Sequence, residues 1–190
     1  MLQVGDKAPE IALRTDSGAE FKLSALKGKR VVLYFYPRAD TPGCTIEACE
    51  FRDGIGKFAK KGAAVVGVSP DKPAAQAKFK DKFDLPFTLL ADEEKAAAQA
   101  YGVWKEKNMY GKKVMGIVRS TFVIGPDGKI EKIYAKVKMC IRDRRQVAPG
   151  AAPHHRTGQP VGHHFGRFAE LPQHAEYSRN VVFALSLIHI

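Results

Sequence analysis

A chain of 190 residues with three cysteines is long enough to bury a core without a framework of disulfides. It begins with no apolar run typical of a signal peptide, and no later stretch approaches the roughly 20 apolar residues of a membrane span. The net charge of +11 is carried largely by scattered lysines, which is not the pattern of a nucleic-acid-binding stripe. We therefore expect a cytoplasmic protein that binds neither membrane nor nucleic acid.

The predicted elements of residues 1–138 alternate between strands and helices. A hairpin over 10–26 turns at Asp16-Ser17-Gly18, and the apolar run 30–36 is typical of a strand covered on both faces. Then follow a helix over 41–60, a strand over 63–70, a helix over 72–85, a strand over 87–92, a helix over 93–103 and a hairpin over 120–137 that turns at Pro126-Asp127-Gly128. This order predicts an α/β fold with a mixed central sheet flanked by helices and an N-terminal hairpin.

The composition changes at residue 139. Residues 1–138 hold all of the lysines, whereas residues 139–190 hold none and contain all six histidines. "MCIRDR" (139–144) and "LSLIHI" (185–190) can be encoded on opposite strands of one short DNA element, which resembles the mosaic-end adapter of transposase-based sequencing libraries.

Our hypothesis is that residues 139–190 are translated adapter and unrelated insert, disordered in the protein, and that they replace an expected final helix. The alternative is a natural flexible tail rich in His and Arg. We therefore predict one folded domain over residues 1–138.

The stretch "FYPRADTPGCTIEACEFRD" (35–53) joins a predicted strand to a predicted helix. Thr41 suits the N-cap of that helix, and Pro42 suits its first position, where no amide hydrogen is needed. Cys44 then falls in the first turn, where unpaired N–H groups and the helix dipole favour a thiolate. The placement predicts a reactive cysteine rather than an inert buried one.

A second cysteine, Cys49, follows on the same predicted helix. Residues five apart on a regular helix have Cα atoms about 8.6 Å apart. A disulfide requires less than about 7 Å. If Cys44 and Cys49 bond, the first turns of the helix must unwind. A purely structural role for Cys49 is the alternative.

The pattern P-x-x-x-T-x-x-C, formed by Pro37, Thr41 and Cys44, resembles the active-site signature of the peroxiredoxins. The C-x4-C spacing resembles their bacterioferritin-comigratory, or Q-type, subgroup. The similarity covers roughly residues 3–138. It implies a thioredoxin-like fold and a thiol-dependent peroxidase that reduces hydrogen peroxide and organic hydroperoxides. We expect neither a metal nor a cofactor, since two cysteines supply only half of a tetrahedral zinc site.

The resemblance also implies a role for each of five residues. Cys44 is the peroxidatic nucleophile, and Cys49 is the resolving thiol, whose disulfide with Cys44 is reduced by thioredoxin or a similar protein. Thr41 hydrogen-bonds the thiolate and the peroxide, and Pro37 shields the site from water. Arg119 places a cation beside the sulfur. We expect a monomer or a weak homodimer.

The sequence leaves two alternative functions to consider. A general thioredoxin-like disulfide oxidoreductase is disfavoured, because it would use C-x-x-C rather than C-x4-C. A basic binder of nucleic acid or anionic surfaces is motivated only by the net charge of +8 on residues 1–138. Glu47 and Arg52 also match the Q-type pattern, and we interpret each as a partner in a helix-face ion pair.

Overall fold

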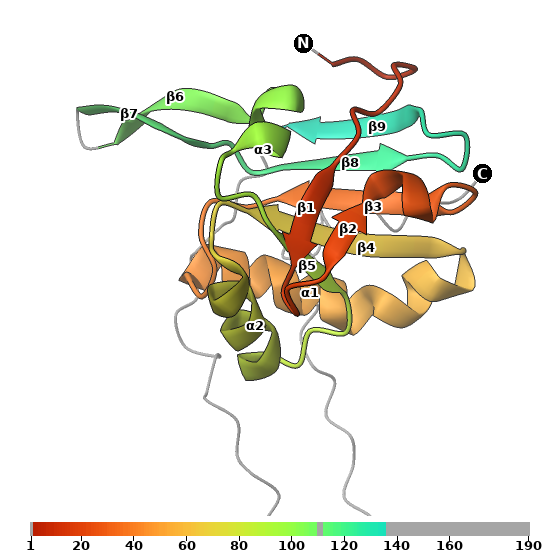
Figure 1. Ribbon diagram of the computed structural model, residues 1–190, viewed down its shortest axis with the longest axis horizontal. Helices are drawn as coiled ribbons and strands as arrows, with labels where there is room; N and C mark the ends of the chain where they lie inside the picture. The colour runs from red at the N-terminus through yellow and green to blue at the C-terminus, as the bar shows by residue number, and fades with distance from the viewer. Residues whose placement is uncertain (1, 110–111, 136–190) are drawn as a thin grey trace, which may run out of the picture.

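A seven-stranded mixed sheet forms the centre of the protein (Figure 1). The computed structural model describes residues 2–109 and 112–135. The strand order is β2-β1-β5-β4-β3-β8-β9. The three central strands are parallel, and the strands on either side of them are antiparallel to their neighbours. Their bounds are β1 Ala12–Thr15, β2 Glu20–Lys22, β3 Arg30–Phe35, β4 Ala63–Ser69, β5 Thr88–Ala91, β8 Ser120–Ile124 and β9 Ile130–Ala135.

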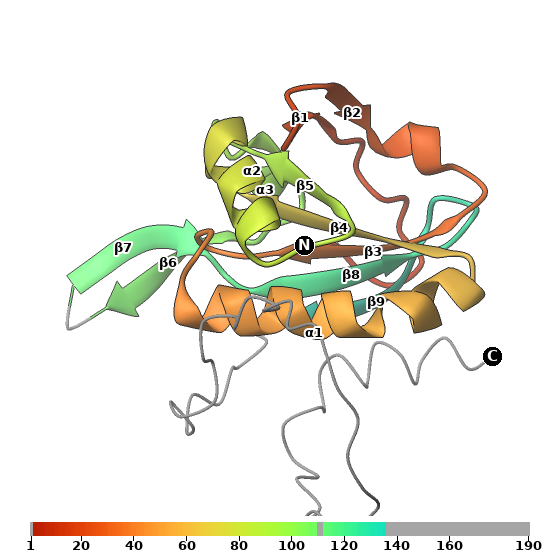
Figure 2. The same ribbon diagram turned by 90° about the horizontal axis from the view of Figure 1, so that it is seen from below.

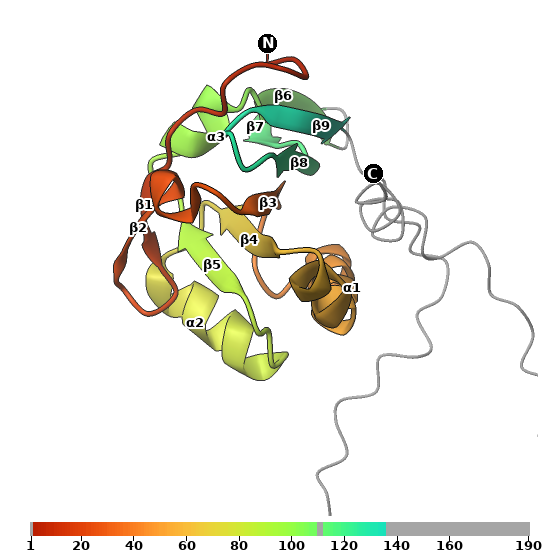
Figure 3. The same cartoon turned by 90° about the vertical axis from the view of Figure 1, so that its right-hand side faces the viewer.

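Helices cover both faces of this sheet (Figure 3). α1 (Pro42–Lys60) and α2 (Pro73–Lys82) lie on one face, and α3 (Ala96–Ala100) lies on the other. β3 supplies alternate side chains to the two cores, which explains its continuous apolar sequence. Val31, Leu33 and Phe35 join the core under α3, whereas Val32, Tyr34 and Tyr36 join the core under α1 and α2.

The predicted α/β order is confirmed, with one difference in the helices, the length of α3. α1 runs unbroken through Gly54 and Gly56, because Phe51 and Phe58 bury one face of the helix and offset the poor helix propensity of glycine. α3 is much shorter than the predicted 93–103. It begins late because the buried Asp92 carboxylate accepts the backbone N–H groups that open the helix.

A two-stranded ribbon was not predicted. β6 (Trp104–Met109) and β7 (Lys112–Ile117) pair antiparallel and extend beyond the main sheet (Figure 2). Their lysine-rich sequences lack the clear alternation of a half-buried strand. A short 3-10 helix, Leu23–Leu26, follows β2. The predicted final helix and the hypothesis for residues 139–190 lie outside the described residues.

No helix in the part of the chain that the structure describes is long and apolar enough to cross a membrane.

Candidate active site

Cys44 lies in the first turn of α1, just beyond the carboxyl end of β3. Its side chain is 1% exposed and packs in the core under α1 and α2. The first hydrogen bond of the helix runs from Thr45 N to Thr41 O over 2.8 Å, so the Gly43 and Cys44 amides precede the helical ladder. The sulfur therefore lies at the positive end of the helix dipole.

Arg119, which is distant in sequence, places a cation beside this sulfur. Its Nη2 lies 3.1 Å from Cys44 Sγ, although 75 residues separate the two in sequence. Arg119 directly precedes β8, and β8 pairs with β3 so that Ser120 lies opposite Phe35. This register places the guanidinium beside the start of α1. Its side chain is only 13% exposed, so the cation is largely shielded from water.

Glu47 completes the cluster and was not predicted as part of it. Its carboxylate forms an ion pair with Arg119, which therefore bridges Glu47 and Cys44. Burial raises the pKa of Glu47 to about 7, although Arg119 acts in the opposite direction. Burial lowers the pKa of Arg119, but Glu47 and Cys44 raise it, and the net shift is upward. The three-residue spacing from Cys44, which puts both side chains on one helix face, was the available signal.

Glu47 makes the stability of the fold depend on pH. Its pKa is about 7 in the fold and 4.5 as an unperturbed carboxyl, so the folded protein binds this proton more tightly. The contribution of Glu47 to the free energy of unfolding is therefore fully present below about pH 4.5 and is lost as the pH rises through about 7. Between pH 5 and 8 we expect wild-type protein to lose up to about 3 kcal/mol more unfolding free energy than Glu47→Gln, as measured by urea denaturation.

The matched control for this experiment is Glu106→Gln, which removes an exposed carboxylate that pairs with Lys113 on the ribbon. It should follow the wild-type pH curve. Glu50, whose pKa burial also raises to about 7, is present in all three proteins, and its charge is one of the causes that raise the pKa of Glu47. Parallel curves for wild type and Glu47→Gln would show that Glu47 does not titrate in this range.

Thr41 and Pro37 lie at the entrance to α1. Thr41 is the N-cap by backbone conformation, as predicted, but its hydroxyl does not cap a helix N–H. The hydroxyl instead donates to the Arg38 carbonyl over 3.1 Å. Pro37 follows β3 and is exposed. The burial of Cys44 is thus provided mainly by the side chains of the core, among them Tyr34 and Tyr36.

Cys49 is a free, half-buried thiol on the same helix as Cys44. Burial raises the pKa of the Cys49 thiol, although the Arg52 charge lowers it. Because α1 is continuous from Pro42 to Lys60, helix geometry keeps the two cysteine Cα atoms about 8.6 Å apart. The structure therefore brings Cys44 and Arg119 together but keeps Cys49 out of bonding reach.

A second cation, Lys107 of β6, lies near the cluster and was also missed. Its side chain passes over Gly116, where a β-carbon would lie 3.6 Å from Lys107 Cδ, and it donates to the Ile117 carbonyl. Burial lowers the pKa of Lys107, and the charge of Arg119 lowers it further. No sequence signal pointed to Lys107, because the ribbon itself was not expected.

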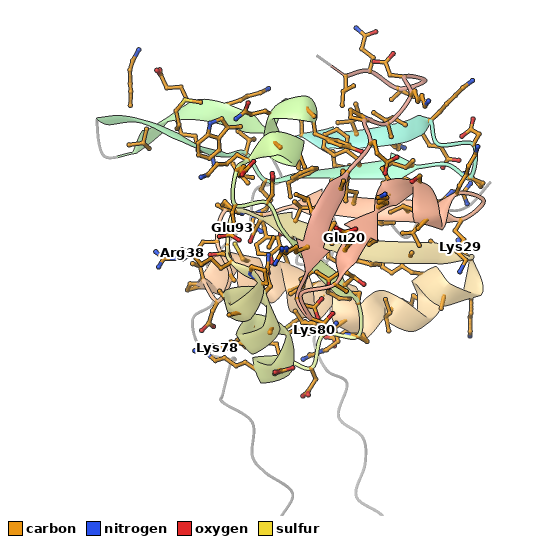
Figure 4. The ribbon with its side chains drawn as sticks, in the orientation of Figure 1. Glu20, Lys29, Arg38, Lys78, Lys80 and Glu93 are labelled. Carbon is orange, nitrogen blue, oxygen red and sulfur yellow. The ribbon has the colours of Figure 1, made fainter. Side chains whose placement is uncertain are left out.

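A cavity of about 500 Å³ lies elsewhere. It is lined by residues of β1 and β2, by residues 91–94 and by Ala96, with Glu20 and Glu93 among its walls (Figure 4). None of the five predicted site residues lines it. Within residues 2–109 and 112–135, no three His, Cys, Asp or Glu side chains are grouped as a metal site.

Known proteins are similar to this chain in both sequence and fold. Residues 4–133 match the family model described as the AhpC/TSA family. The peroxiredoxin Bcp of Bacillus subtilis (strain 168) is 51% identical over 138 residues, covering 73% of this chain and 88% of that protein. The peroxiredoxin Bcp of Escherichia coli (strain K12) is 44% identical over 137 residues, covering 72% and 88%.

Solved structures give the same result. A mutant of peroxiredoxin Q from Xanthomonas campestris is 41% identical with a TM-score of 0.65, covering 67% of this chain and 82% of that chain. A mutant of PrxQ from Xylella fastidiosa is 34% identical with a TM-score of 0.69, covering 73% and 88%. These similarities define the class as a thiol peroxidase with a thioredoxin-like fold.

The chain belongs to the AhpC/TSA family and, within it, to the Q-type peroxiredoxins. It is therefore an oxidoreductase that reduces peroxides with a thiol. The predicted class and fold are confirmed. The domain boundary at residue 138, the cytoplasmic location and the monomeric or weakly dimeric state stay predictions.

Proposed function

We propose that Cys44 is the peroxidatic cysteine and Cys49 the resolving cysteine of this peroxiredoxin. The contact between Arg119 Nη2 and Cys44 Sγ, at a buried helix start, is the observation that carries the assignment. A cation and a helix N-terminus together favour the thiolate, which is the nucleophilic form of cysteine. Cys49 is half-buried, and its burial raises the pKa of its thiol, so it is suited to act second.

In the first step, the Cys44 thiolate attacks one oxygen of the hydroperoxide and the O–O bond breaks. Cys44 becomes a sulfenic acid, and the other oxygen leaves with a proton as water or an alcohol. Arg119 donates to the sulfur and is placed to steady the negative charge that moves onto the leaving oxygen. A turn of the Thr41 hydroxyl away from the Arg38 carbonyl lets it donate to the thiolate or the peroxide, while Pro37 limits the entry of water.

In the second step, the Cys49 thiol attacks the sulfenic sulfur. An S–S bond forms, and the sulfenic oxygen leaves as water. The first turn of α1 unwinds for this step, because a disulfide cannot span five residues of regular helix. Thioredoxin or a similar dithiol protein then returns two electrons and two protons, which restores both thiols and leaves the reductant as a disulfide.

We assign hydrogen peroxide and organic hydroperoxides as the substrates. One structural neighbour, a bacterioferritin comigratory protein of Xanthomonas campestris, is described as having alkyl peroxide reduction activity. That chain is 41% identical to this one and has a TM-score of 0.65, which supports the same substrate class here. The apolar core around Cys44 also suits an organic substituent on the peroxide.

The resolving role of Cys49 is tested by Cys49→Ser. This variant should consume one equivalent of peroxide per chain, because Cys44 and Arg119 are intact. It should then stop, because Cys49 is no longer present to convert the sulfenic acid to the disulfide that thioredoxin reduces. The measurement is a thioredoxin-coupled peroxidase assay, with a single-turnover peroxide titration beside it. Continued turnover at the wild-type rate would mean that another thiol resolves Cys44.

A further inference from the structure

The loop that leads from β3 into α1 is held by a carboxylate from the next strand–helix connection. The backbone N–H of Ala39 donates to Asp71 Oδ2 over 2.7 Å, a short distance typical of a bond to a charged acceptor. Asp71 lies between β4 and α2, 32 residues further along the chain. The bond therefore ties residues 37–41, which lead to Cys44, to a segment outside α1.

Asp71 is itself held by a chain of buried side chains that donate in its direction. Ser69 Oγ donates to Asp71 Oδ2 over 2.7 Å, and Gln76 Nε2 donates to Ser69 Oγ over 2.8 Å. The Tyr36 hydroxyl donates to Gln76 Oε1, and burial raises the pKa of this phenol, so it stays a donor. Bonds in such a chain polarise one another, which makes Asp71 a firmly placed acceptor.

A second contact of this loop is made by Asp40. Asp40 has a φ of 55°, in the left-handed region that aspartate adopts more often than most residues other than glycine. Its carboxylate accepts hydrogen bonds from Lys82 Nζ of α2 at 2.8 and 2.9 Å. The Lys82 side chain is 58% exposed and the Asp40 side chain 50%, and such exposed ion pairs contribute little to stability. In Figure 4, Arg38 of the loop and Lys78 of α2 extend from the same side of the molecule. The part-buried bond to Asp71 is thus the stronger tie.

We propose that Asp71 is a positioning residue for the peroxidase cycle. By holding Ala39, it keeps Cys44 in the buried arrangement beside Arg119 and limits the unwinding that lets Cys44 reach Cys49. This inference rests on the proposed function of the two cysteines. It goes beyond that function because it names the contact that sets how often the first turn of α1 opens.

The tie has a chemical consequence, because the sulfenic acid on Cys44 has two fates. In one, Cys49 attacks the sulfur, an S–S bond forms and water leaves. In the other, a second hydroperoxide transfers an oxygen to the sulfur, which becomes a sulfinic acid, and the peroxide leaves as an alcohol or water. The first fate needs the open loop and the second uses the closed one. Loosening the tie should therefore favour the disulfide.

The experiment compares the full chain with Asp71→Ala and Asp71→Asn. The control is Asp81→Ala, which removes an exposed carboxylate from α2. Each reduced protein is mixed with cumene hydroperoxide over a range of concentrations, without reductant, and then quenched with acid. Mass spectrometry measures the disulfide and the sulfinic acid. The readout is the peroxide concentration that gives equal amounts of both products.

We expect this concentration to rise about tenfold in Asp71→Ala, since a hydrogen bond to a charged acceptor typically shifts an equilibrium by that much or more. Asp71→Asn keeps an acceptor oxygen for Ala39 but loses the charge, so its shift should be smaller. The Asp81→Ala control should match wild type. An unchanged concentration in folded Asp71→Ala overturns the inference.

A second measurement keeps the inference separate from the proposed function. If wild-type protein forms no Cys44–Cys49 disulfide at all, the proposed resolving role fails. The hydrogen bond from Ala39 to Asp71 is then tested by amide hydrogen exchange of Ala39 in the reduced protein. We expect this exchange to be severalfold faster in Asp71→Asn than in wild type, because a hydrogen bond to a neutral oxygen is weaker than one to a carboxylate. Equal exchange rates of Ala39 in wild type and Asp71→Asn overturn the inference. This test does not depend on the folding of Asp71→Ala.

Discussion

Replacing Cys44 by serine should reduce peroxide consumption by about 10³-fold or more, because a serine hydroxyl is not ionised at neutral pH and is a far weaker nucleophile than a thiolate. The side chain is isosteric and lies in a core position, so the fold should persist. The rate is followed by loss of hydroperoxide in a rapid-mixing experiment with excess reductant. Cys49→Ser is the matched control, since it makes the same chemical change five residues along α1 and should still consume one equivalent.

The same variant separates the peroxidase from a general disulfide oxidoreductase. The peroxidase reading requires that peroxide consumption be lost in Cys44→Ser. If the variant loses activity toward a disulfide substrate but still consumes peroxide at the wild-type rate, the assignment of Cys44 as the peroxidatic cysteine is wrong.

Arg119→Met should slow the reaction of Cys44 with peroxide by about 10²–10³-fold, the usual cost of removing one preorganised donor from a developing charge. Methionine keeps much of the length of the side chain but removes the charge and both hydrogen bonds. Arg119→Lys should recover part of the rate, since it restores a charge but not the fork that spans Cys44 and Glu47. The measurement is the second-order rate constant for oxidation of the reduced protein.

One complication is that Arg119→Met leaves the Glu47 carboxyl buried without its cation. The double variant Glu47→Gln with Arg119→Met removes this unpaired group. It should regain stability in urea denaturation while its reaction with peroxide stays slow. A double variant that reacts at the wild-type rate would show that Arg119 serves the carboxyl of Glu47 rather than the sulfur of Cys44.

The fold was predictable where local pattern and tertiary structure agree. The run 30–36 is apolar throughout, and β3 is indeed covered on both faces. The turns at Gly18 and Gly128 were visible because both glycines adopt positive φ values in tight turns. The ribbon of β6 and β7 was not visible, since it lies outside the main sheet and its strands carry no clear alternating pattern.

The site was predictable only in part, for a physical reason. The place of Cys44 follows from residues 41–44 alone, because helix capping is local. The place of Arg119 follows from the pairing of β3 with β8, which sequence pattern does not specify, so only the family resemblance pointed to it. The bond from Ala39 to Asp71 depends on side-chain direction in two loops, and no periodic signal reports such a contact.

The pairing of β3 with β8 has one more consequence. Strand side chains alternate in direction, so a slip of one residue between these strands would turn Arg119 to the opposite face and away from Cys44. The reactivity of Cys44 toward peroxide therefore reports on the correct alignment of β8 against β3. A misfolded chain with normal secondary structure would be recognised by its unreactive thiol.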